Sequence, residues 1–148
     1  MFSFRRMVGA GVAALGLTLG LSLPTAVAAQ ADPLSTKTFT LGQDLHAGDC
    51  TLFHGARWTL GSDGTASFDG VVTSSDNNDA YLLWVHLRDG RRAELYRLRN
   101  AALQNPRDSH EFIRNLPDHR VQYRWRADGT FNRRDFREIR SITWEPHC

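Results

Sequence analysis

The stretch AYLLWVHL, residues 80–87, decides how this chain folds. It is apolar at almost every position, as in a strand that is buried on both faces; a strand with one exposed face would alternate apolar and polar residues. Four hydrogen-bonding side chains precede it, Asp76, Asn77, Asn78 and Asp79. Asp and Asn tolerate turn geometry and bond to nearby backbone groups. We therefore expect a turn at 76–79 that leads into a central β-strand.

Shorter runs of β-forming residues lie on both sides of this strand. They are CTLFH (50–54), ARWTL (56–60), TASFDGVVTSS (65–75), RAELYRLR (92–99), VQYRWR (121–126) and RSITW (140–144). Asp-Gly pairs at 63–64, 89–90 and 128–129 each predict a hairpin. RWTLGSDGT (57–65) and RWRADGT (124–130) share Arg-Trp and Asp-Gly-Thr, which suggests the same hairpin built twice. Gly70 predicts a bulge within its strand.

Two segments have helical features. Asp108 can cap a short helix with Glu111 as its capping partner, burying Phe112, Ile113 and Leu116. Residues 132–139 can form a helical turn with Phe136 and Ile139 inward. The pattern as a whole predicts an all-β fold, or a β fold with one or two short helices, arranged as a small antiparallel barrel or sandwich closed by one disulfide.

The first 31 residues resemble a secretory signal peptide. Arg5 and Arg6 precede an apolar stretch at 7–23, and small residues then offer cleavage after Ala28 or after Ala31. The alternative is a permanent membrane anchor, for which this stretch is at the lower length limit. We expect a single secreted β-rich domain, residues 32–148, that is extracellular and has no membrane attachment after cleavage.

The charge of the exported part is balanced. The chain has 18 basic and 16 acidic residues, so loss of Arg5 and Arg6 leaves 16 of each. Residues 80–148 carry fourteen of these basic residues and only nine acids. A nucleic-acid-binding domain is usually strongly basic, so we expect no nucleic-acid partner.

Two cysteines, Cys50 and Cys148, remain after cleavage. In an exported protein they predict one disulfide within the chain, and hence a monomer. A bond between two chains is the alternative.

The order of these motifs is similar to that of a family of small secreted actinobacterial proteins with a domain of unknown function. The similarity runs from about residue 48 to residue 148 and includes Cys50, Trp58, the Asp63-Gly64-Thr65 turn, Ser74-Ser75-Asp76, Arg124-Trp125 and Cys148. It implies secretion and a Cys50–Cys148 bond. It brings no activity, and so no catalytic residue can be carried over.

The candidate sites favour binding over catalysis. An EF-hand read from Asp76 has oxygen ligands at its first two required positions only, so we expect a turn and no metal site there. The alternative is a looser calcium site that shares Asp69 or Asp63 from neighbouring loops. Nor do the six histidines show zinc-site spacing, and His86 fits a satisfied strand residue. The four tryptophans (58, 84, 125 and 144) fit the core better than a ligand pocket.

We expect a binding or inhibitor-type module with no cofactor and with an extracellular protein or carbohydrate as its partner. Its candidate contact residues are Asp76, Asn77, Asn78 and Asp79 in the turn and Arg124 and Arg126 on the 121–126 strand. The alternative is a small extracellular hydrolase using Asp118 and His119 with a glutamate. No Gly-x-Ser-x-Gly nucleophile elbow is present in the sequence.

Overall fold

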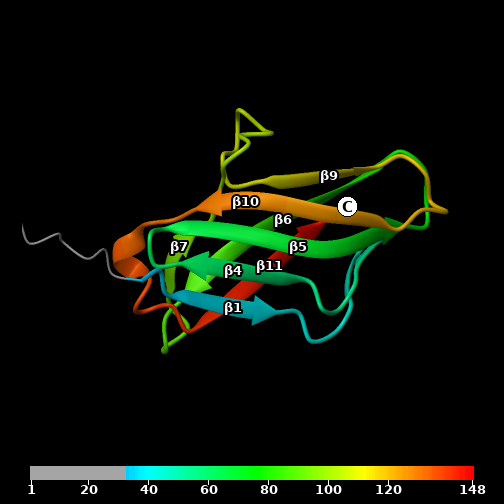
Figure 1. Ribbon diagram of the computed structural model, residues 1–148. Coiled ribbons are helices and arrows are strands. Elements are labelled where there is room, and N and C mark those ends of the chain that lie inside the picture. Colours follow the sequence, from blue (N-terminus) through cyan, green and yellow to red (C-terminus); the bar gives the residue numbers. More distant parts are fainter. Residues whose placement is uncertain (1–32) are drawn as a thin grey trace, which may run out of the picture. The chain divides into compact units, whose positions relative to one another are not determined.

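Alternating burial runs along the two longest strands, β5 (Thr65–Ser74) and β6 (Asp79–Arg88). On each strand every second side chain is buried against the core, because successive side chains point to opposite faces of a sheet. The computed structural model describes residues 33–148 and places β5 and β6 in different sheets, one in front of the other in Figure 1. The predicted signal peptide lies outside the described residues.

The larger sheet has seven antiparallel strands. Its main order is β1 (Thr36–Thr40), β4 (Arg57–Gly61), β5, β10 (Tyr123–Thr130) and β8 (Arg99–Asn100). Two short strands, β2 (Leu45–Ala47) and β3 (Cys50–Leu52), extend it beside the second half of β5. One face of this sheet is turned toward the viewer in Figure 1. That outer face carries the candidate site.

The smaller sheet has four antiparallel strands, with β6 in the middle. β11 (Ser141–His147) pairs with one edge of β6, while β7 (Glu94–Arg97) and β9 (Phe112–Leu116) share the other edge. The central strand predicted at 80–87 is therefore confirmed, but it is fully buried on one face only, since Leu82 and Trp84 on the other face are half-buried. The two sheets do not close into a barrel, so the sandwich is the correct form of the predicted all-β fold.

Aromatic side chains from both sheets meet in the core. Phe68 of β5 lies 5.1 Å from Trp58, 5.0 Å from Trp125 and 6.1 Å from Trp144 between ring centroids. Trp144 belongs to the smaller sheet, so these contacts join the two layers. Burying one such side chain contributes about 1.5–3 kcal/mol. Trp84 differs from the prediction: it points to the outer side of β6, and its indole donates to Asp108 at 2.8 Å.

The disulfide joins Cys50 at the start of β3 to Cys148 after β11, with 5.9 Å between the Cα atoms. The predicted bond within the chain is confirmed. It ties an outlying strand of the larger sheet to the end of the smaller one.

The helix predicted around residues 108–116 is wrong. Phe112–Leu116 form β9, which pairs with β6 from Asp79↔Leu116 to Leu83↔Phe112. The pairing buries Phe112 and Leu116 on one face, a result that the helical spacing predicted equally well. The turn predicted near 132–139 is present as the 3₁₀ helix η1 (Arg133–Asp135), and Phe136 and Ile139 are buried as expected.

Two glycine predictions are also wrong. Asp128 and Gly129 lie inside β10, paired with Ser67 and Ala66, so the second copy of the hairpin does not exist. A Cβ on Gly129 would lie 3.1 Å from the Arg99 carbonyl oxygen, and the glycine therefore serves close packing. β5 continues through Gly70 without a bulge; the irregularity is in β6, between Leu87 and Arg88. The hairpins at 63–64 and 89–90 are present.

None of the helical segments in residues 33–148 has both the length and the apolar character required to cross a membrane.

Candidate functional site

Three arginines surround one aspartate on the outer face of the larger sheet. Asp69 of β5 is the register partner of Arg57 on β4 and of Arg126 on β10, so all three side chains share one face. Arg124 reaches the same carboxylate from two residues earlier on β10. We call Arg57, Arg124 and Arg126 with Asp69 the arginine cluster.

The contacts within the cluster are unequal. Arg124 makes a two-pronged bond to Asp69, with its Nε 2.9 Å from Oδ1 and an Nη 2.9 Å from Oδ2. Arg57 donates to Oδ2 at 3.3 Å, while the Nε of Arg126 lies 3.9 Å from Oδ1, beyond hydrogen-bond range. Asp69 therefore fixes Arg124 and leaves most donors of Arg57 and Arg126 free.

The electrostatics of the cluster follow from this geometry. The hydrogen bond from Arg124, together with the positive charge of the three guanidinium groups, holds the pKa of Asp69 below its usual value. The same bond raises the pKa of Arg124. Among residues 33–148, no other carboxylate lies within 4.0 Å of these arginines. The cluster thus has three positive charges and one negative charge, with the arginine side chains 54–72% exposed.

A shallow pocket of about 420 Å³ adjoins the cluster. It lies beside β5, at the segment that connects β3 to β4. Asp69 and Arg124 form one wall, and Phe53, His54 and Gln122 are among its other lining residues. Gly55, whose φ of +85° favours glycine, turns the chain between β3 and β4 and opens this space.

The predicted turn at 76–79 connects β5 to β6 and is tied down locally. Asp79 accepts a hydrogen bond from the buried Ser74 hydroxyl, and Asn78 adopts a φ of 63°. Asn77 accepts from the backbone N–H of His119 at 3.0 Å. In residues 33–148, no hydrogen bond or ion pair joins Asp76–Asp79 to the arginine cluster, so the two predicted contact surfaces are separate.

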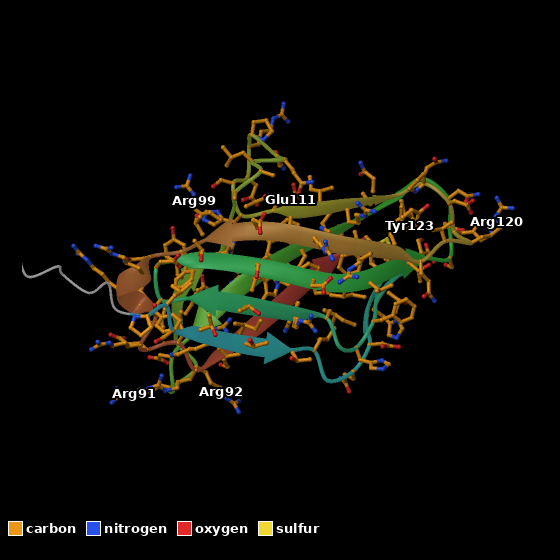
Figure 2. The ribbon with its side chains drawn as sticks, viewed as in Figure 1. Arg91, Arg92, Arg99, Glu111, Arg120 and Tyr123 are labelled. Carbon is orange, nitrogen blue, oxygen red and sulfur yellow. A yellow bond between two sulfur atoms is a disulfide. The ribbon has the colours of Figure 1, made fainter. Side chains whose placement is uncertain are left out.

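The hydrolase candidates Asp118 and His119 face different partners. Asp118 accepts from the Nε of Arg120 at 3.0 Å and from an Nη at 2.9 Å, bonds that lower the pKa of Asp118 to about 2. His119 has its Nδ1 2.8 Å from Oδ1 of Asn77. In Figure 2 Arg120 projects outward from the end of this loop, next to the start of β10 at Tyr123. No glutamate bonds to either residue within the described part of the chain.

The structure places the buried His86 between two partly exposed glutamates, an arrangement that the sequence analysis missed. His86 lies on the outer side of β6, with its Nδ1 2.8 Å from Glu94 and its Nε2 2.7 Å from Glu145. The hairpin at 89–90 brings Glu94 near this strand and is visible in the sequence. Glu145 arrives through β11, whose pairing with β6 no local signal specifies.

Only one group of three potential metal ligands comes close together in residues 33–148: Cys50, Asp79 and Cys148. Both sulfurs are in the disulfide, so neither can act as a thiolate ligand.

Comparison with known proteins adds one finding. Residues 57–148 match a family of unknown function, DUF6294. The chain belongs to this family. The DUF6294 region includes Cys148 and all four residues of the arginine cluster, whereas Cys50 lies before it. No curated protein and no solved structure matches the chain.

Proposed function

We propose that this protein is an exported binding domain whose contact surface is the arginine cluster. The observation that carries the proposal is the set of three exposed guanidinium groups that share a single carboxylate. They project from neighbouring strands of one sheet, where backbone pairing fixes the positions from which the side chains extend. Binding sites on rigid elements need little ordering when the partner arrives.

Export is supported by two features. The pattern of residues 1–31 is that of a signal peptide, and disulfides persist mainly in oxidising compartments outside the cytosol. The Cys50–Cys148 bond fits such a compartment.

The alternative, a hydrolase using Asp118 and His119, has less support from the geometry. A general base must reach the proton it removes, and a third group usually orients it. Here Arg120 occupies the carboxylate of Asp118, and His119 is bonded to Asn77.

Capture from culture medium tests the proposal. Residues 32–148 are immobilised and exposed to medium in which the producing organism has grown, and retained material is compared with that of an Arg124→Ala/Arg126→Ala variant. We expect the variant to lose the retained material while its unfolding curve stays close to that of the parent.

An Arg91→Ala/Arg107→Ala variant is the matched control. It removes two exposed arginines whose side chains make no hydrogen bond or ion pair within residues 33–148. Arg91 lies on the β6–β7 turn, at the opposite end of the sandwich from Arg120 (Figure 2). Equal loss in both variants, or in neither, would overturn the proposal.

A further inference from the structure

We infer that the ligand of the arginine cluster is an acidic polysaccharide that lies across the outer face of the larger sheet. This inference rests on the proposed function and names the chemical class of its partner. The inference is based on the side chains and the hollows that surround the arginine cluster on that face.

Hydroxyl side chains continue the face beyond the arginines. In the next row of register partners, Thr38 on β1, Thr59 on β4, Ser67 on β5 and Asp128 on β10 lie side by side. The hydroxyls of Thr38 and Thr59 are 3.3 Å apart. Hydroxyls both donate and accept hydrogen bonds, and the Asp128 carboxylate accepts them, so this row matches the hydroxyl groups of a sugar chain, while the anionic groups of that chain belong at the arginines.

A second hollow opens over this row. Its volume is about 390 Å³, and its lining includes Thr59, Thr65, Ser67 and the acidic residue Asp128. The first pocket lies beside Gly70 and Val71, so the two hollows lie on opposite sides of Asp69 along β5. The four residue steps from Ser67 to Val71 span roughly 13 Å. Both volumes are in the range of small-ligand sites, and a linear polymer could fill both while crossing the arginines.

The charge identifies the polymer as acidic. A guanidinium group binds a carboxylate or a similar oxyanion through two parallel bonds, the geometry that Arg124 already shows with Asp69. Arg57 and Arg126 flank that pair with most donors free, so each can take an anionic group of the ligand.

A peptide fits this face less well. The backbone N–H and C=O groups of β4, β5 and β10 are hydrogen-bonded to neighbouring strands. An extended peptide forms main-chain hydrogen bonds at the edge of a sheet, so this face offers it none. Protein interfaces centre on aromatic residues as well as on arginine, and the outward side chains of β5 include no aromatic one. The outward side chains of β5 are Thr65, Ser67, Asp69, Val71 and Thr73, while Phe68 points into the core.

Binding of defined polymers tests the inference. Residues 32–148 are titrated with polygalacturonate, with the same polymer after methyl esterification, with dextran sulfate and with poly-glutamate of matched charge. We expect the acidic polysaccharides to bind, the esterified polymer not to bind, and poly-glutamate to bind more weakly. The tighter of polygalacturonate and dextran sulfate identifies the anionic group.

Variants then separate geometry from charge. Arg126→Ala should weaken polysaccharide binding about tenfold, the loss of one charge-assisted contact. Arg126→Lys keeps the positive charge but loses the two-pronged guanidinium geometry. Its affinity for the polysaccharide should lie between that of Arg126→Ala and that of the parent. Ser67→Ala should weaken binding of the polysaccharide and leave poly-glutamate unaffected. The Arg91→Ala/Arg107→Ala control should bind like the parent.

Poly-glutamate binding as tightly as the polysaccharides, or polysaccharide binding that Arg126→Ala leaves unchanged, would overturn the inference. If no polysaccharide binds while capture from medium still requires Arg124 and Arg126, the inference fails and the proposed function stands. If capture is independent of the arginines, the proposed function itself fails.

Discussion

Gly70 shows how closely single residues are fitted in this core. It lies within β5, and a Cβ built on it would be 2.7 Å from Cζ of Phe68 and 2.9 Å from Cβ of Ala56. We expect Gly70→Ala to lower the free energy of unfolding by about 1–3 kcal/mol through overpacking. Urea unfolding measures this loss.

Gly42→Ala is the control for that measurement, because nothing lies within 4 Å of its Cβ. It should be neutral, or stabilising by up to about 1 kcal/mol through the unfolded chain. Equal losses at Gly42 and Gly70 would show that strand packing at Gly70 is not the cause.

The pair formed by Glu94 and His86 predicts a pH-dependent stability. The hydrogen bond from His86, aided by its charge and by Arg97 and Arg88, lowers the pKa of Glu94. Because the folded pKa lies below the unfolded value of about 4.3, the ionised carboxylate stabilises the fold above that pH. This contribution declines below pH 4.3 and is lost as the pH falls through the folded pKa.

Glu94→Gln should therefore lower the free energy of unfolding at pH 7 by at most about 1 kcal/mol, since Glu94 is partly exposed. The difference from the parent should close below about pH 4. Glu138→Gln is the control, because its exposed side chain makes no hydrogen bond within the described residues. A Glu94→Gln deficit that persists at low pH would contradict this account.

At the scale of elements, β10 separates stability from the proposed binding surface. Trp125 is 2% exposed and contacts Phe68, whereas Arg124 points to solvent. Trp125→Ala should lower the free energy of unfolding by about 3–5 kcal/mol, by lost burial and a cavity. Arg124→Ala should leave thermal unfolding nearly unchanged, because an exposed ion pair adds little stability. Similar losses in the two variants would place Arg124 in the core.

The connection between β5 and β6 carries a prediction about calcium. A side-chain oxygen of Asn77 accepts a hydrogen bond from His119, and one of Asp79 accepts from Ser74. These oxygens therefore stabilise the turn and are already occupied by protein donors. We expect millimolar calcium or added chelator to leave the melting temperature unchanged. A site saturated 100-fold would add about 2.7 kcal/mol, which corresponds to several degrees for a domain of this size.

Elements that depend on local sequence were predicted better than those that depend on pairing between distant strands. The turn at 63–64 is local and was predicted correctly. The strand predicted at 121–126 is correct only from Tyr123 onward, because Val121 lies before β10 and is 40% exposed. Phe112, Ile113 and Leu116 suit one face of a helix as well as a paired strand, and pairing with β6 decides between them. The arginine strand face was predicted in part: Arg124 and Arg126 are exposed as expected. Their shared partner Asp69 could not be inferred, because it depends on the register of β5 against β10.

For the whole molecule, the largest single covalent constraint is the Cys50–Cys148 bond, which closes a loop of 98 residues. In the chain-entropy model a loop of this length stabilises the fold by about 4.7 kcal/mol, less where the unfolded chain stays compact. Cys50→Ser/Cys148→Ser should lower the free energy of unfolding by a few kcal/mol in urea. The unfolded parent should show no alkylatable thiol before reduction and two afterwards; two thiols before reduction would contradict the bond.

The same bond divides the chain under mechanical tension. If residue 33 and residue 148 are pulled apart, force passes from Cys50 directly to Cys148, and the loop between them, with most of the sandwich, carries no load. Only residues 33–49, which contain β1 and β2, can be drawn out. At about 3.5 Å per residue the oxidised chain lengthens by roughly 60 Å, against roughly 400 Å for residues 33–148 after reduction. All four residues of the arginine cluster lie inside the shielded loop. A ligand held there would keep its arginine contacts while the N-terminal strands, with Thr38 of β1, are pulled away.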